Sequence, residues 1–174
     1  LGEEAVSDGR TPILGERFFC VDPIDGTKDF IAGETGEFTV NIALIEAGRP
    51  VMGVVLAPAT GALYAAEPGR VLKGFADARA VRITTPLAPI RVASHKRAWR
   101  VIASRRHGKG GKVEQFLAAL GEHEQLAASS SIKFCRLAEG DADIYPRFGP
   151  VSEWDAAAGH AVLHAAGGEI MLLD

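Results

Sequence analysis

In several segments along the first part of the chain, apolar residues alternate with polar ones or gather with β-branched residues. This pattern predicts strands near 17–22, 37–46, 50–57 and 61–66. Glycine and proline mark the turns between the last three strands, at 48–50 and 58–61. Turns this short join neighbouring strands, so we expect an antiparallel meander. Shorter strands are predicted near 71–75, 79–83, 90–94 and 99–103.

Helical patterns follow in the second half of the chain. Over 112–120, one apolar face is formed by Val113, Phe116, Leu117 and Leu120, a spacing typical of an amphipathic helix. Two further helices are predicted over 131–139 and 153–166, the second ending at Gly167-Gly168. Strands that come first and helices that come mainly later predict an α+β layered fold.

Composition restricts the function classes. A chain of 174 residues with 47% hydrophobic content can bury the core of one globular unit. Its net charge of −3 argues against a general nucleic-acid binder. No apolar run approaches the ~20 residues of a membrane span, and no signal peptide is visible. Cys20 and Cys135 lie in apolar stretches and are interpreted as buried thiols of a reducing compartment, so we expect a cytoplasmic protein.

The segment Asp22-Pro23-Ile24-Asp25-Gly26-Thr27 follows the apolar run 18–21 directly. A strand that enters a tight turn would place both carboxylates at the edge of a sheet, beside a glycine and a hydroxyl. Oxygen ligands without histidine or cysteine suit a hard divalent cation, Mg²⁺ above all. An alternative stays open, because Asp-Pro and Asp-Gly are also strong signals for a simple turn.

Two further acids extend this pattern: Glu3 upstream, in Glu3-Glu4, and Asp155 downstream, after Trp154. Asp155 has a second interpretation, because Ser152-x-x-Asp155 resembles a capping box at the start of a helix. The two roles are compatible, since a helix N-terminus also attracts phosphate through its free backbone amides.

Five blocks of sequence resemble the inositol monophosphatase superfamily of metal-dependent, lithium-sensitive phosphatases, and within it the CysQ-type 3′(2′),5′-bisphosphate nucleotidases. The resemblance extends from Glu3 to about Gly168. The blocks are Asp25-Gly26-Thr27-Lys28-Asp29-Phe30, the segment 36–45, Ser130-Ser131-Ile132-Lys133-Phe134-Cys135, Tyr145-Pro146-Arg147-Phe148-Gly149-Pro150 and the segment 154–162.

The resemblance implies the family's α+β fold, a layered αβαβα sandwich with the metal site between its halves. It implies a single phosphatase unit over 1–174, with a metal-binding, β-rich half at 1–84 and an α/β half at 85–174 that holds the specificity residues and the last metal ligand. Family members carry N-terminal helices before the equivalent of Glu3 and a final strand after the equivalent of Asp174, so this sequence is expected to lack both.

Metal ligands are also implied by the resemblance. Glu3, Asp22 and the Ile24 carbonyl match ligands of one ion, while Asp22 and Asp25 bridge toward another that Asp155 completes. At ~4 Å and an effective dielectric near 20, each pair of like charges costs about 4 kcal/mol. Two or three Mg²⁺ ions would relieve this repulsion.

Thr27 is by itself most often a turn hydroxyl. By resemblance it matches the threonine that orients and helps to activate the attacking water, and with Asp25 it forms the expected catalytic pair. The backbone amides of Gly26 and Thr27 would hold phosphate oxygens. No phosphoenzyme is needed, so we expect direct hydrolysis by a metal-activated water.

Lys133 and Arg147 match family positions that bind the non-reacting phosphate and the nucleoside, assisted by Ser130 and His107. Taken alone, both cations are typical solvated surface charges. An arginine offers phosphate a bidentate fork, whereas an inositol monophosphatase carries an acidic residue near this place. The basic segment 104–112 is not a phosphate loop, because its glycine spacing is wrong and Val113 stands where Ser or Thr is needed.

The resulting hypothesis is a Mg²⁺-dependent phosphatase that converts adenosine 3′,5′-bisphosphate to AMP and phosphate, which removes a by-product of sulfate assimilation. Inhibition by Li⁺ is expected from the resemblance. Two alternatives stay open: an inositol or sugar monophosphatase with the same metal chemistry, and a non-catalytic protein that binds metal or nucleotide. We expect a small phosphorylated substrate, no nucleic-acid partner and no integral membrane segment. A homodimer and a peripheral association with the inner membrane stay open.

Overall fold

The computed structural model describes residues 1–10, 12–33, 37–94, 98–104 and 111–172. Its largest element is an antiparallel sheet whose first six strands are hydrogen-bonded in chain order, with the last strand pairing β5. These strands are β1 (Arg17–Asp25), β2 (Thr39–Glu46), β3 (Arg49–Ala57), β4 (Ala62–Glu67), β5 (Arg70–Asp77), β6 (Arg82–Ile83) and β7 (Ala88–Pro89). The predicted antiparallel meander is confirmed.

The turn predicted at 48–50 begins one residue earlier. Ala47 and Gly48 both have positive φ, 47° and 75°, as a tight hairpin of this hand requires. Arg49 and Pro50 therefore already belong to β3, where Pro50 pairs with Ile45 at an irregularity in the register. A sheet tolerates proline at such an irregularity.

Of the shorter predicted strands, the one at 79–83 is shorter than expected and the one at 90–94 is wrong. The strand expected at 79–83 contains only Arg82–Ile83, because the Asp77 carboxylate accepts hydrogen bonds from the backbone N–H groups of Arg79 and Ala80 and forms a turn. The segment 90–94 forms no strand. Its apolar residues instead connect the layers, and the Val92 N–H donates to the Ala166 carbonyl, 3.1 Å away.

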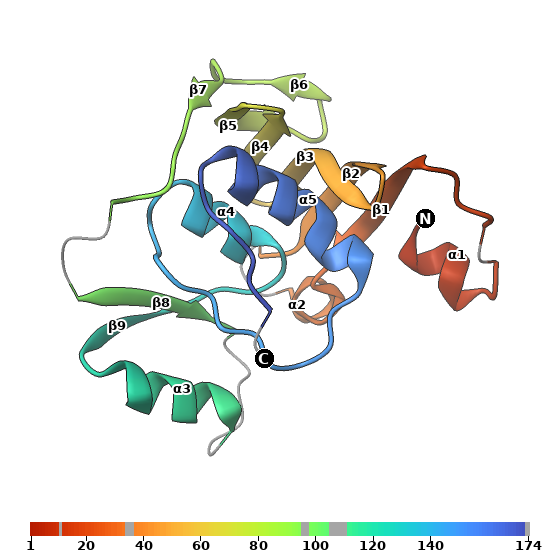
Figure 1. The fold of residues 1–174 in the computed structure, drawn as a ribbon. Coiled ribbons are helices and arrows are strands. Elements are labelled where there is room, and N and C mark those ends of the chain that lie inside the picture. The colour runs from red at the N-terminus through yellow and green to blue at the C-terminus, as the bar shows by residue number, and fades with distance from the viewer. Residues whose placement is uncertain (11, 34–36, 95–97, 105–110, 173–174) are drawn as a thin grey trace.

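Two helices, α4 (Ile132–Ala138) and α5 (Glu153–Ala165), pack against one face of the main sheet (Figure 1). The core between them includes the fully buried Tyr64 of β4 and Val162 of α5. Helix and sheet approach so closely that a Cβ at Gly53 of β3 would lie 2.5 Å from the Ala158 carbonyl oxygen. The predicted helices at 131–139 and 153–166 are confirmed to within a residue or two.

A second, parallel pair of strands lies beyond these helices: β8 (Trp99–Ala103) and β9 (His123–Ala127). The predicted helix α3 (Lys112–Leu120) connects them and lies on their outer side (Figure 1). The layers of an α+β sandwich, with mixed sheets and helices, are thus confirmed. Two short helices, α1 (Glu3–Ser7) and α2 (Thr27–Ala32), were not predicted.

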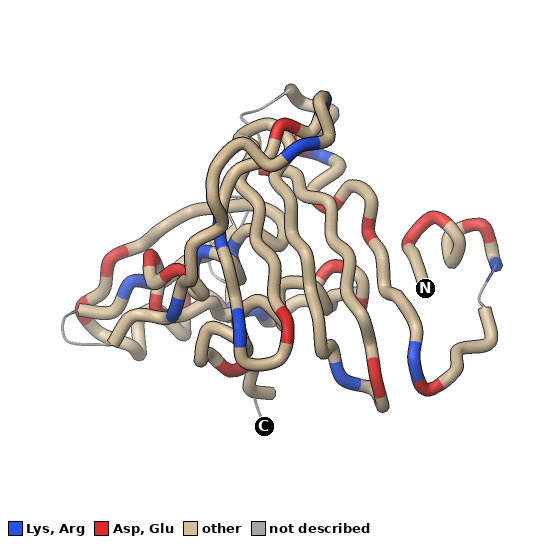
Figure 2. The backbone as a smooth tube through the Cα atoms, turned by 90° about the horizontal axis from the view of Figure 1, so that it is seen from above, with Lys and Arg blue, Asp and Glu red and all other residues tan. Residues whose placement is uncertain are grey.

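Basic and acidic positions are mixed over the backbone, and the acidic residues of α1 lie beside the end strand β1 (Figure 2). Among the described residues, no helix is both long enough and apolar enough to cross a membrane.

Candidate active site

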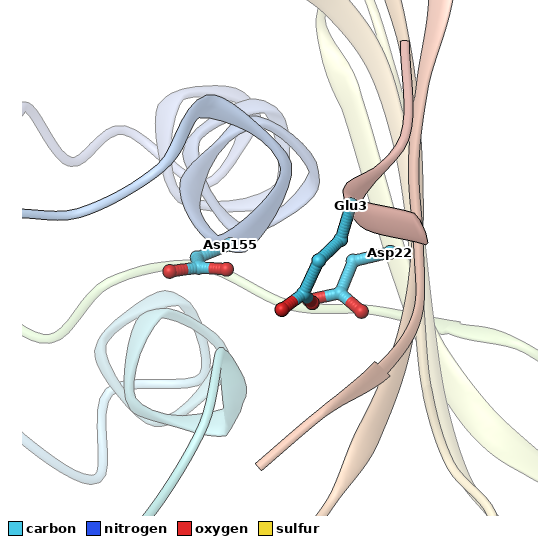
Figure 3. A group of neighbouring side chains, drawn as sticks. All are labelled: Glu3, Asp22 and Asp155. Carbon is cyan, nitrogen blue, oxygen red and sulfur yellow. The ribbon is translucent and has the colours of Figure 1, made fainter. Parts of the chain in front are cut away.

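Three carboxylates from distant parts of the chain face one another (Figure 3). Glu3 begins α1, Asp22 lies in β1 and Asp155 lies in the first turn of α5. One oxygen from each carboxylate lies within 4.8 Å of the others. Repulsion at such distances disfavours three negative charges unless protons or a cation neutralise them.

Glu3 is positioned by the residues before it. The Val21 N–H of β1 donates to the Leu1 carbonyl, 2.8 Å away, and Gly2 forms a parallel bridge with Val21. This pairing places the start of α1 against the edge strand, so that the Glu3 side chain points toward Asp22 (Figure 3). Burial and the nearby Asp155 charge raise the pKa of Glu3.

Asp22 is fully buried, with 0% of its surface exposed. Its Oδ1 accepts a hydrogen bond from the Ile24 N–H, 2.9 Å away, while its Oδ2 has no partner among the described residues. Burial is the main cause that raises the pKa of Asp22 to about 7, and the charges of Asp25 and Glu3 add to it. A buried carboxylate oxygen without a donor, surrounded by other acids, fits a divalent cation with oxygen ligands.

Asp155 forms the capping box predicted for it and also lies close to the other two acids. Its Oδ2 accepts a hydrogen bond from the Ser152 N–H, 3.4 Å away, within a capping box at the start of α5. The same side chain faces Glu3 and Asp22 (Figure 3). The helix start therefore aims this carboxylate at the other two.

Asp25 lies just past a register irregularity in the pairing of β1 with β2. Its Oδ2 accepts a hydrogen bond from the Ser131 N–H, 2.5 Å away, at the start of α4. Burial and the Asp155 charge raise the pKa of Asp25 to about 6, although the nearby Lys133 ammonium opposes this shift. Asp25 thus lies between the carboxylate cluster and the second half of the chain.

These side chains border a pocket of about 500 Å³. It brings together ten of the eleven residues predicted for the site, namely Glu3, Asp22, Ile24, Asp25, Gly26, Thr27, Ser130, Lys133, Arg147 and Asp155. The eleventh predicted residue, His107, lies outside the described residues.

The turn after Asp25 supplies a hydroxyl to this pocket. Gly26 has a φ of 91°, which favours glycine, and it leads into the short helix α2. Thr27 Oγ1 donates a hydrogen bond to the Ile24 carbonyl, 3.2 Å away. The Thr27 hydroxyl therefore makes the local hydrogen bond expected of a turn, and Thr27 also lines the pocket wall.

The two predicted cations differ in their environments. Lys133 is only 4% exposed, so it is not the solvated surface charge that its residue type suggests. Its Nζ donates to the Ser130 carbonyl, 2.6 Å away, and lies 5.2 Å from the centre of the Tyr145 ring. Burial lowers the pKa of Lys133 to about 8. Arg147 is exposed, and its Nη2 donates to the Pro150 carbonyl, 2.5 Å away.

The sequence interpretation missed a polar group behind the pocket. Thr39 and Asn41 of β2 are buried, as is Ser131, whose Oγ donates to Asn41 Oδ1 over 2.6 Å. A signal was present: Thr39 and Asn41 occupy the same alternating face of β2 as the buried Ala43 and Ile45. Polar residues at core-facing positions of a strand need partners, and here the partner comes from the start of α4.

Comparisons with known proteins identify the family of this chain. The model of the Inositol monophosphatase family matches residues 1–174. The 3′(2′),5′-bisphosphate nucleotidase CysQ of Escherichia coli (strain K12) is 44% identical over 156 residues, which cover 89% of this chain and 58% of that protein. The CysQ of Buchnera aphidicola is 39% identical over 155 residues, covering 88% of this chain and 54% of that protein.

Among solved structures, CysQ from Bacteroides thetaiotaomicron, described as a bacterial member of the inositol monophosphatase family, matches with a TM-score of 0.79 and 38% identity. The match covers 96% of this chain and 65% of that one. An inositol monophosphatase from Anabaena shares the fold, with a TM-score of 0.75 and 24% identity. This chain spans less than two thirds of the length of these relatives, and it belongs to the inositol monophosphatase family.

Proposed function

We propose that this chain belongs to a Mg²⁺-dependent phosphatase that hydrolyses the 3′-phosphate of adenosine 3′,5′-bisphosphate to give AMP and phosphate. The observation that carries the proposal is one pocket in which a carboxylate cluster meets Lys133 and Arg147. The similarity to proteins named 3′(2′),5′-bisphosphate nucleotidase supports this choice of substrate.

The residues present fit a hard divalent cation. The unpartnered Asp22 Oδ2 and the cluster of three carboxylates provide oxygen ligands, the type that Mg²⁺ prefers. We assign the ligands of two or three ions to the side chains of Glu3, Asp22, Asp25 and Asp155 and to the Ile24 carbonyl. When bound, Mg²⁺ supplies Lewis-acid polarisation of the phosphate and of water.

The turn between β1 and α2 serves the reacting phosphate in this proposal. The Gly26 and Thr27 amides donate hydrogen bonds to phosphate oxygens, because they lie at the pocket wall beside the carboxylates. Thr27 Oγ1 donates to the Ile24 carbonyl, so its lone pairs can accept a hydrogen bond from a water that approaches phosphorus. Thr27 thereby orients the attacking water. Asp25, which lies beside the carboxylate cluster, is its catalytic partner.

The second half of the chain binds the rest of the substrate in this proposal. Arg147, at the exposed rim, offers its planar guanidinium to the non-reacting phosphate. Lys133 lies deeper, where its ammonium contributes positive potential between that phosphate and Asp25. Ser130 lines the same wall, and His107 stays a prediction for the nucleoside side.

The proposal also includes a metabolic role and a cellular compartment. Removal of adenosine 3′,5′-bisphosphate belongs to sulfur metabolism, and sensitivity to Li⁺ is expected for an enzyme of this family. Cys20 and Cys135 are free, buried thiols, which suits the reducing cytoplasm in which we place the protein.

Phosphate release by the full-length protein with Mg²⁺ tests the proposal, with adenosine 3′,5′-bisphosphate, AMP and inositol 1-phosphate compared side by side. We expect a strong preference for the bisphosphate. A preference for inositol 1-phosphate would keep the metal chemistry but overturn the substrate. Nucleotide binding that depends on Mg²⁺, without any phosphate release, would favour a binding protein instead.

A further inference from the structure

Three consecutive serines, Ser129, Ser130 and Ser131, connect β9 to α4, and side chains from the first part of the chain hold this triplet. The Ser129 N–H donates to Glu37 Oε2, 2.7 Å away, and the Ser131 N–H donates to Asp25 Oδ2, 2.5 Å away. Both contacts join residues more than ninety positions apart in sequence. The triplet therefore links the strand that carries the carboxylates to the helix that carries the lysine.

The Ser131 hydroxyl is fixed from behind by two side chains of β2. It lies 2.6 Å from Asn41 Oδ1 and 2.7 Å from Thr39 Oγ1. Asn41 Oδ1 can only accept, so Ser131 donates to it, and in the Ser131–Thr39 pair the Thr39 hydroxyl is then the donor. Ser130 Oγ lies farther from Thr39 Oγ1, at 3.3 Å. Ser131, Asn41 and Thr39 are at most 1% exposed, so water does not replace the bonds between them.

The register of the sheet explains why this anchor reaches Asp25. Thr39 pairs with Asp25, and Asn41 pairs with Asp22, across the β1–β2 ladder. The same two residues of β2 that flank the acids of β1 therefore also hold the start of α4. The backbone of Ser130 has a positive φ of 51°, a conformation that a non-glycine residue keeps only where its surroundings hold it.

We propose that Ser131 is a positioning residue for Asp25, held in place by the hydroxyl of Thr39 and the amide oxygen of Asn41. The inference rests on the proposed function, in which Asp25 is a metal ligand. Because a carboxylate is planar, fixing its Oδ2 by the Ser131 N–H sets the direction of Oδ1. The anchored hydroxyl keeps that N–H in place, and it also fixes the helix that carries Lys133. Ser131 thus couples the cation site to the phosphate site.

The first test compares Mn²⁺ binding, measured by calorimetry on the full-length protein, in Ser131→Ala and wild type. The substitution keeps the backbone N–H but removes its anchor, so we expect Mn²⁺ affinity to fall by about 10-fold to 100-fold, as for other partners of metal ligands. The Mg²⁺ concentration for half-maximal phosphate release should rise in parallel.

Tyr64→Phe is the matched control. It removes a buried hydroxyl that donates to Glu139 Oε2, 3.1 Å away, at the opposite end of the same helix. Both variants are expected to unfold at a lower temperature than wild type, but only Ser131→Ala should bind Mn²⁺ more weakly. Equal Mn²⁺ affinity in the two variants would overturn the positioning role.

A second pair keeps the test decisive if Ser131→Ala fails to fold. Thr39→Val is nearly isosteric and removes one bond to the Ser131 hydroxyl, so it should weaken Mn²⁺ binding several-fold. Thr39→Ser keeps the hydroxyl, so it should bind Mn²⁺ about as tightly as wild type. If both Thr39 variants bind Mn²⁺ equally well, the inference is wrong while the metal site stands. A wild-type protein that binds no Mn²⁺ would overturn the proposed metal site together with this inference.

Discussion

The Asp22 carboxylate is fully buried and lies among other acids, so a single substitution should change stability and activity in opposite directions. Asp22→Asn removes a carboxylate whose negative charge the fold disfavours, as its pKa of about 7 indicates. In chelator at pH 8 the variant should therefore unfold at a higher temperature than wild type. Phosphate release should fall by more than roughly 100-fold, beyond the loss typical for a mere partner of a metal ligand.

Thermal unfolding and phosphate release measured on the same samples check this expectation. Asp8→Asn is the control, because the Asp8 side chain is 64% exposed and pairs only with Arg10 among the described ion pairs. It should leave both quantities unchanged. An Asp22→Asn protein that unfolds earlier than wild type in chelator would contradict the electrostatic account of the cluster.

Arg147 provides the corresponding test of substrate choice. Replacing it by Glu reverses the charge at the exposed rim of the pocket, where the non-reacting phosphate is expected. Arg147→Glu should lose the preference for adenosine 3′,5′-bisphosphate over AMP while it keeps some hydrolysis, and Arg147→Lys should keep part of the preference because the charge remains. An unchanged ratio of kcat/KM for the two substrates in Arg147→Glu would remove this residue from the specificity role.

At the scale of the elements, the close packing of α4 against α5 connects the two sides of the site. A Cβ at Gly159 of α5 would lie 2.5 Å from Cδ2 of Phe134 in α4. Gly159→Val should separate the helices that carry Asp155 and Lys133, and should destabilise the protein by about 1–3 kcal/mol, typical for overpacking. Chemical denaturation measures this change. Gly15→Ala, where a Cβ would contact nothing within 4 Å, is the control and should leave stability unchanged.

The same elements show what the sequence can predict. Strands β2 to β4 were predicted because their alternating apolar residues pack on the helices. β9 was missed, since its sequence HEQLA is mostly polar and it forms a strand through pairing with β8. The helices α1 and α2, of five and six residues, are too short to show helical periodicity. The division at 84/85 stays a prediction.

The candidate site was predicted only in part, for a related reason. From local sequence, Asp25 is a turn residue and Asp155 is a helix cap. The cap is present, whereas Asp25 is the last residue of β1, after a register irregularity and directly before the turn at Gly26. Their approach to Glu3 depends on contacts between segments far apart in the chain, which no local pattern specifies. The resemblance supplied those partners. Ser131 lies in one of the blocks that carry the resemblance, but no role was assigned to it, because that role depends on the buried contacts of Thr39 and Asn41.

For the whole molecule, the raised pKa values predict how stability depends on pH without divalent cations. The pKa of Asp22 is about 7 and that of Asp25 about 6, against about 4 for an unfolded aspartate. Between these limits the folded state binds more protons than the unfolded state, so these two groups lower stability as pH rises from 5 to 7.5. Lys133, with a pKa of about 8, titrates mainly above this range.

A bound divalent cation favours the ionised carboxylates, so it should reverse this trend. We expect Mg²⁺ to raise the unfolding temperature more at pH 7.5 than at pH 5, because at pH 5 protons compete for the same oxygens. Scanning calorimetry of wild type and Asp22→Asn, with chelator and with Mg²⁺ at both pH values, measures the difference. The Asp22→Asn protein should lose most of the pH-dependent gain. If Mg²⁺ stabilised wild type equally at both pH values, the cation would have to bind away from the buried carboxylates, and the metal assignment would be wrong.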